Sequence, residues 1–180
     1  GAMTILSSVM QFSMLPLIGL TQGAQPIISY NYGAAKSSRV KCTFILLLLS
    51  AMGYSTLLWA LAMLFPQLFA RIFTSDAQLI NVTASALRIY MAASLLLGIQ
   101  ISCQQTFIAL GNAKVSVFLA LLRKIILLIP LIYLLPLLIE NKVSAVYLAE
   151  PIADFLAVTV TAIMFISQFK KILRELPANR

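Results

Sequence analysis

The sequence predicts an all-α, polytopic membrane protein, a helical bundle with about five transmembrane helices. Hydrophobic residues make up 61% of the 180 residues, and charged residues make up 10%, against roughly 25% in a typical soluble domain. Such a chain has too few polar groups to cover a surface that faces water. In addition, the uncharged runs exceed the roughly 20 residues that a helix needs to cross a bilayer.

Five spans are expected, at residues 4–32, 40–66, 79–110, 115–138 and 143–170. The first three contain uncharged runs that are long enough on their own. The fourth reaches spanning length only by including Arg123 and Lys124, and the fifth only by including Glu150 and Asp154. Short links make sequential helices antiparallel neighbours.

Capping and turn residues stand at the expected boundaries. They are Gly33 with Ser37 and Ser38, Thr74-Ser75-Asp76, Gly111-Asn112, and Glu140-Asn141-Lys142 before Ser144.

The basic residues divide unequally between the two ends of this bundle. Eight lie at one end: Lys36, Arg39, Lys41, Lys114, Lys170, Lys171, Arg174 and Arg180. Two lie at the other end, Arg71 and Lys142, together with the acidic residues Asp76 and Glu140. Because cytoplasmic loops carry the excess of Lys and Arg, we expect a cytoplasmic first loop and a cytoplasmic tail at residues 176–180. The expected location is the cytoplasmic membrane of a bacterium.

Five spans and a cytoplasmic C-terminus would leave the N-terminus outside, already within an apolar helix. We therefore expect the chain to be the C-terminal part of a larger protein, with at least one preceding helix missing. Residues 1–3, Gly1-Ala2-Met3, resemble a remnant of expression cloning.

Several function classes are excluded by composition. The chain has no histidine, which removes the commonest general base and metal ligand. Cys42 and Cys103 are far apart and form no zinc or redox motif. We expect no enzyme activity, no metal site and no cofactor. The net charge of +8 falls in loops beside the spans, so the expected partner is the lipid bilayer and not nucleic acid.

Polar residues within the apolar runs are the candidates for function. In the first span, Gly19 and Gly23 form a G-x-x-x-G pair that permits close helix packing. Pro26 interrupts the backbone ladder, and Gln22 and Gln25 are candidates to line a cavity beside it; simple helix packing is the alternative.

In the third span, Gln100 and Gln104 share a helix face and indicate either a wet cavity or interhelical hydrogen bonds. In the fourth span, Arg123 is a candidate for a gate or a charge pair, unless it reaches the interface by snorkelling.

Glu150 and Asp154 form the sharpest signal, since they stand one turn apart on the last span with Pro151 between them. Two carboxylates this close in a low dielectric disfavour joint ionisation unless a cation intervenes. That chemistry is typical of a proton or sodium site. The alternative is a position near the outer interface, or an ion pair with Arg88, Arg123 or Lys124.

Residues 25–34 (QPIISYNYGA), including Asn31 and Gly33, resemble the signature of the multidrug and toxic compound extrusion (MATE) transporters, in the second helix of their C-terminal lobe. Four further segments are similar to that family, and the last is similar to its MepA-like bacterial branch. They are residues 39–41 (RVK), residues 105–114 (QTFIALGNAK), Arg123 with Pro130 and Pro136, and residues 149–154 (AEPIAD).

The resemblance implies a twelve-helix protein of two lobes, of which residues 4–175 would form a partial C-terminal lobe. The N-terminal lobe and one preceding helix would be its partners within the same protein. The implied function is secondary active multidrug efflux, in which organic cations or amphipathic drugs are exchanged for H⁺ or Na⁺ by alternating access.

Two alternatives stay open at this point. One is a lipid or lipid-linked saccharide flippase, which would need a cationic cavity formed by Arg88, Arg123 and Lys124. The other, of a different class, is a structural membrane subunit.

The charge bias gives a topology that labelling can test. In the full-length protein, single cysteines at Ser38→Cys and Ser75→Cys should react with impermeant maleimide from opposite sides of the membrane. Reaction of Ser75→Cys from the cytoplasmic side alone would refute the assignment.

Overall fold

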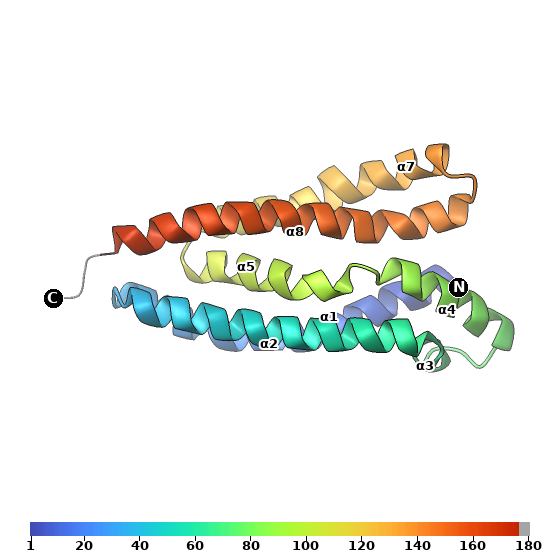
Figure 1. The fold of residues 1–180 in the computed structure, drawn as a ribbon, viewed down its shortest axis with the longest axis horizontal. Helices are drawn as coiled ribbons and strands as arrows, with labels where there is room; N and C mark the ends of the chain where they lie inside the picture. The colour runs from blue at the N-terminus through green and yellow to red at the C-terminus, as the bar shows by residue number, and fades with distance from the viewer. Residues whose placement is uncertain (177–180) are drawn as a thin grey trace.

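The computed structural model describes residues 1–176, and every element in this part of the chain is a helix. The long helices run side by side along one axis and form an elongated bundle (Figure 1). Four helices are long and apolar enough to cross a membrane, or five if one bent pair counts as a single span. The chain is thus an all-α, multi-pass membrane protein, as the sequence predicts.

The elements follow in this order. They are α1 (Ala2–Gly33), α2 (Ser37–Leu64), α3 (Pro66–Arg71), α4 (Ala77–Tyr90), the 3₁₀ turn η1 (Ser94–Leu96), α5 (Leu97–Ala109), α6 (Ala113–Leu121), the π-helix η2 (Leu122–Leu128), α7 (Ile129–Leu138) and α8 (Lys142–Glu175). Residues 177–180 of the expected tail, including Arg180, lie outside the described residues.

The two ends of the bundle carry different loops (Figure 1). The α1–α2 and α5–α6 links lie at the same end as the C-terminal end of α8, and these segments hold the basic residues Lys36, Arg39, Lys41, Lys114, Lys170, Lys171 and Arg174. The N-terminus, α3 and the α7–α8 link lie at the opposite end. The uneven charge distribution therefore holds in three dimensions, while the side on which each end lies stays a prediction.

The helix boundaries agree with the expected spans to within a few residues, but one expected cap is wrong. Neither Ser37 nor Ser38 caps α2, which begins after Lys36 with no side-chain cap; the tight link turns instead at Ala35, with φ 54°. Asp76 accepts hydrogen bonds from the backbone at the start of α4, as expected. Asn141, expected to close the fourth span, instead caps the start of α8 by accepting from the Ser144 backbone.

The second span begins and ends earlier than expected. α2 ends at Leu64 and not at residue 66, because Pro66 cannot continue the backbone ladder and begins α3.

The third expected span, at residues 79–110, is not one continuous helix. α4 ends at Tyr90, and the segment from Ser94 to Ala109 continues at an angle of 48°. Non-helical backbone at membrane depth needs other hydrogen-bond partners. Trp59 Nε1 supplies one by donating to the carbonyl oxygen of Ala92 at 3.0 Å. At the end of α2, Arg88 Nε donates to the carbonyl oxygen of Met63 at 3.0 Å.

The glycines pack differently from the prediction. Gly19 and Gly23 are exposed, and a Cβ atom at either position would meet nothing within 4 Å. They do not form a close helix contact, so that interpretation of the G-x-x-x-G pair is wrong for the described structure. The close contact occurs at Gly98 of α5, where an added Cβ would stand 2.7 Å from the carbonyl carbon and oxygen of Ala51 in α2.

Gly98→Ala should lower the free energy of unfolding by about 1–3 kcal/mol, since the backbone of α2 must move to admit a methyl group. Gly53→Ala is the matched control, because Gly53 lies within α2 with open space at its Cβ position. The control should be neutral or slightly stabilising. Thermal unfolding in detergent measures both, and equal melting temperatures would contradict the close contact.

Candidate functional site

A cluster of four charged side chains joins η2 to α8 inside the bundle. Arg123 Nε lies 2.5 Å from Asp154 Oδ1, and Arg123 Nη2 lies 3.3 Å from Glu150 Oε1. Lys124 Nζ lies 3.5 Å from the same Glu150 oxygen. The Asp154 and Glu150 side chains are 2% and 7% exposed, Arg123 is 11% exposed and Lys124 is 56% exposed. Three of the four charges are therefore buried, and Arg123 is shared between two acids.

Local backbone irregularities position these side chains. Arg123 and Lys124 stand at the start of the π-helix η2, whose wider turn carries more residues than an α-helical turn. Successive residues of an α-helix point about 100° apart. The wider π turn is the local feature that accompanies the approach of both neighbouring cations to Glu150. On α8, Pro151 donates no backbone hydrogen bond beside the two acids.

Small residues let α8 pack deeply in the bundle. Ala145, Ala149, Ala153 and Ala157 repeat every four residues and are buried, and they form one face of the helix. The acids follow this face, since Glu150 and Asp154 each come directly after one of these alanines. The packing explains why both carboxylates are buried far from a helix end.

The sequence analysis gave an ion pair with Arg123 as one alternative for Glu150 and Asp154. The structure has this ion pair, because Arg123 stands between the two acids. Arg123 offsets their mutual repulsion, so a proton shared between the carboxylates is not required in this arrangement. Glu150 lies one turn nearer the start of α8 than Asp154, and it is almost as buried within the bundle. One oxygen remains without a partner within the described residues, the buried Asp154 Oδ2.

Gln100 and Gln104 extend the polar interior toward this cluster. Gln104 Nε2 donates to the carbonyl oxygen of Ser116 in α6 at 3.3 Å, while both side-chain polar atoms of the buried Gln100 lack a partner within residues 1–176. At a rise of 1.5 Å per residue, Gln100 lies about 6 Å from Gln104 along α5, away from the α5–α6 link. Arg123 lies about 10 Å from Ser116, also away from that link. The Gln100 amide therefore stands within about one helical turn of the height of Arg123.

Further hydroxyl groups near this level are buried without a hydrogen-bond partner among the described residues, including Ser94, Ser102 and Thr161. Buried polar groups are normally hydrogen-bonded. Their hydrogen bonds would need ordered water or a small shift of the side chains.

The structure does not join the candidates on the first span to this cluster. Gln22 and Pro26 are exposed and Gln25 is half-buried on α1, a helix that packs against α2, α4 and α5. Gly19 and Gly23 line an open groove between α1 and α2 of about 460 Å³.

The end of α1 holds the last two sequence candidates. Asn31 Nδ2 donates to the carbonyl oxygen of Ile27, while Asn31 Oδ1 is buried and has no partner in the part of the chain that the structure describes. Gly33 is exposed as the last residue of α1.

Tyr90 is a neighbour of the charge cluster that the sequence analysis did not identify. It is 5% exposed at the end of α4, within electrostatic reach of Glu150, Asp154 and Arg123. The unexpected break after residue 90 accounts for this position, since it allows α4 to approach α8. Polar residues on either side of the break, Tyr90 and Ser94, were the available signal.

These spans, with a charge cluster inside them, define the chain as a polytopic all-α membrane protein. The model of the MatE family matches residues 1–134, so the chain belongs to this family. The expected family is confirmed.

Three relatives show the extent of the similarity. The multidrug export protein MepA of Staphylococcus haemolyticus (strain JCSC1435) is 23% identical over 154 residues, which are 84% of this chain and 34% of that protein. The MATE multidrug transporter DinF-BH, solved in complex with a ligand, is 38% identical with a TM-score of 0.80, over 88% of this chain and 35% of its own. An inward-facing multidrug resistance MATE family transporter has a TM-score of 0.89 at 17% identity, over 98% and 41%. The chain thus spans between a third and about two-fifths of the length of these proteins.

Removing the central cation tests the cluster. Arg123→Gln leaves the buried Asp154 unpaired and leaves Glu150 with Lys124 alone, and should reduce the free energy of unfolding by about 3–5 kcal/mol. Adding Asp154→Asn to Arg123→Gln should restore part of that loss. Lys124→Gln is the matched control and should cost about 1 kcal/mol or less, since Lys124 is largely exposed. Thermal unfolding in detergent measures all three, and an equal effect of the two single variants would contradict the shared ion pair.

Proposed function

We propose that this chain forms most of the C-terminal lobe of a secondary active multidrug antiporter. In this proposal the complete protein exports organic cations or amphipathic drugs in exchange for H⁺ or Na⁺. Membership of the MatE family and the names of its relatives support multidrug efflux. The proposed location is the bacterial cytoplasmic membrane, with the C-terminus in the cytoplasm and the missing lobe and helix supplied by the same protein.

The observation that carries the coupling proposal is the buried pair of acids held by one arginine. Arginine keeps its charge in proteins, whereas a carboxylate can take up a proton or bind a cation. A proton or sodium ion reaching the free Asp154 Oδ2 would neutralise the acid and weaken its attraction to Arg123. Arg123 thereby serves as a tethered cation that occupies the site whenever the coupling ion is absent.

Forming or breaking the Arg123–Asp154 contact affects two helices at once. The Arg123–Asp154 contact joins η2 to α8, and both elements are locally weakened, one by a π turn and the other by Pro151. Loading with the coupling ion would therefore free the two helices to shift relative to each other. Such a shift gives alternating access a physical basis, because two packings of the same helices become close in free energy.

The arrangement does not favour the flippase alternative. That function needs Arg88, Arg123 and Lys124 around one cavity, to hold a pyrophosphate. Arg123 and Lys124 are instead paired with acids, and Arg88 bonds to the backbone of α2. A purely structural role does not require buried acids whose charges can change.

Asp154→Asn in the full-length protein tests the coupling role. Asparagine keeps the size and a hydrogen-bond acceptor for Arg123 but cannot titrate. Drug efflux from proteoliposomes should fall about tenfold or more, which corresponds to about 1.4 kcal/mol, while the protein is still expressed in the membrane. The melting temperature should fall, because Arg123 keeps Glu150 but loses its bond to Asp154. Glu150→Gln should reduce efflux less, because Arg123 and Asp154 remain paired.

The control is Glu140→Gln, since Glu140 is an exposed acid in the α7–α8 link. Imposed proton and sodium gradients, applied separately, identify the coupling ion. If Asp154→Asn exports drug at the parental rate under both gradients and at every pH, the carboxylate has no coupling role.

A further inference from the structure

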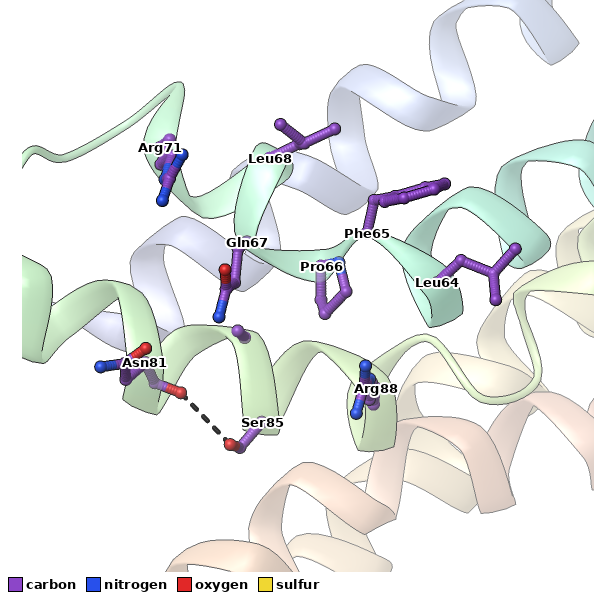
Figure 2. A pocket seen from close by; sticks show the side chains of 10 residues that line it. Leu64, Phe65, Pro66, Gln67, Leu68, Arg71, Asn81, Ser85 and Arg88 are labelled. Carbon is purple, nitrogen blue, oxygen red and sulfur yellow. Dashed lines mark hydrogen bonds between the residues drawn. The ribbon is translucent and has the colours of Figure 1, made fainter.

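A second polar site lies between α3 and α4, at the end of the bundle opposite the basic loops. It is a cavity of about 500 Å³, lined by Gln67 and Arg71 of α3 and by Asn81, Ser85 and Arg88 of α4. Figure 2 shows α3 lying across α4, with the Gln67 side chain directed into the space between the two helices. None of these residues belongs to the cluster around Arg123.

The lining carries positive charge and no acid. Within residues 1–176, neither Arg71 nor Arg88 forms an ion pair. Arg88 is held in place by one bond, from its Nε to the carbonyl oxygen of Met63, and its two terminal nitrogen atoms remain for a ligand. The amide nitrogen of Gln67 adds a neutral donor beside these two cations. Guanidinium groups with such donors are the chemistry that recognises phosphate.

The depth of the cavity points to a lipid. Lys41 is the last basic residue of the α1–α2 end, and Met63 follows it after 22 residues of continuous helix. That separation is about 33 Å, close to the roughly 30 Å of the hydrocarbon core. The Met63 carbonyl and its partner Arg88 therefore stand at the opposite edge of the core, where lipid phosphates lie.

The rim of the cavity is suited to acyl chains. Phe65 and Leu68 also line it, and they are 52% and 57% exposed. A soluble anion would gain nothing from these side chains, whereas a phospholipid would cover them with its hydrocarbon. The pocket is thus polar inside and apolar at its rim. Arg71 and Arg88 both line it, although basic residues are scarce at this end of the bundle.

We propose that the α3–α4 pocket binds the phosphate of an anionic phospholipid, of the phosphatidylglycerol type, in the leaflet opposite the basic loops. Arg71 and Arg88 supply the charge, Gln67 supplies a hydrogen bond, and Phe65 and Leu68 contact the acyl chains. The site is separate from the proposed transport function and does not depend on Asp154.

Native mass spectrometry of the purified full-length protein, titrated with phosphatidylglycerol in detergent, tests the proposal. The parent should retain a bound lipid, and Arg71→Gln combined with Arg88→Gln should weaken that binding about tenfold or more. Lys142→Gln is the matched control, because Lys142 is a basic residue of the same end that lies outside the pocket; it should bind lipid as the parent does. Ser85→Phe, which fills the pocket without removing charge, should also weaken binding and covers the case that the double variant fails to fold.

A competition with glycerol phosphate and a comparison of the variants decide whether the pocket holds a lipid phosphate, a soluble anion or another part of the protein. Millimolar glycerol phosphate should not displace the lipid, and full displacement would show a site for soluble anions instead. Equal lipid binding by the parent, by Ser85→Phe and by the folded double variant would overturn the proposal, and would mean that another part of the protein covers the pocket. Equal loss with Lys142→Gln would reduce the effect to general surface charge and would overturn it as well.

Discussion

Arg123 is the residue on which the interior of this bundle depends. A buried carboxylate is costly in a membrane, and two of them one turn apart on α8 are more costly still. The guanidinium group of Arg123 reaches both acids, so their burial becomes tolerable. In return the acids hold η2 against α8, and the alanine face of α8 can then pack deeply in the bundle. The same ion pair stabilises the fold and supplies the groups whose charge can change.

The large features of the fold could be predicted from the sequence because the bilayer allows few solutions. Runs of about 20 apolar residues must be helices, and loop residues such as Asp76 cap them. The alternation of the expected spans predicted which links share one end of the bundle (Figure 1). The acids of residues 149–154 were also identified, since carboxylates within a span stand out from the apolar background.

Other features depend on contacts between helices and could not be predicted from local patterns. The break after Tyr90 is stabilised by Trp59 of another helix, which bonds to the carbonyl of Ala92. The π turn around Arg123 has no sequence signature, since its residues are ordinary helix formers. Likewise the G-x-x-x-G motif predicted close packing at Gly19, whereas the close contact lies at the isolated Gly98.

The π turn at residues 122–128 also affects how this span would tolerate the loss of a residue. In a regular helix, the loss of one residue rotates everything after it by about 100°, which would turn polar side chains toward lipid. The wide turn at residues 122–128 holds surplus backbone, so it can absorb a one-residue deletion by closing to an α-helical turn while α7 keeps its direction. Among the described helices, this is the segment where evolution can add or remove a residue without re-aiming the whole span.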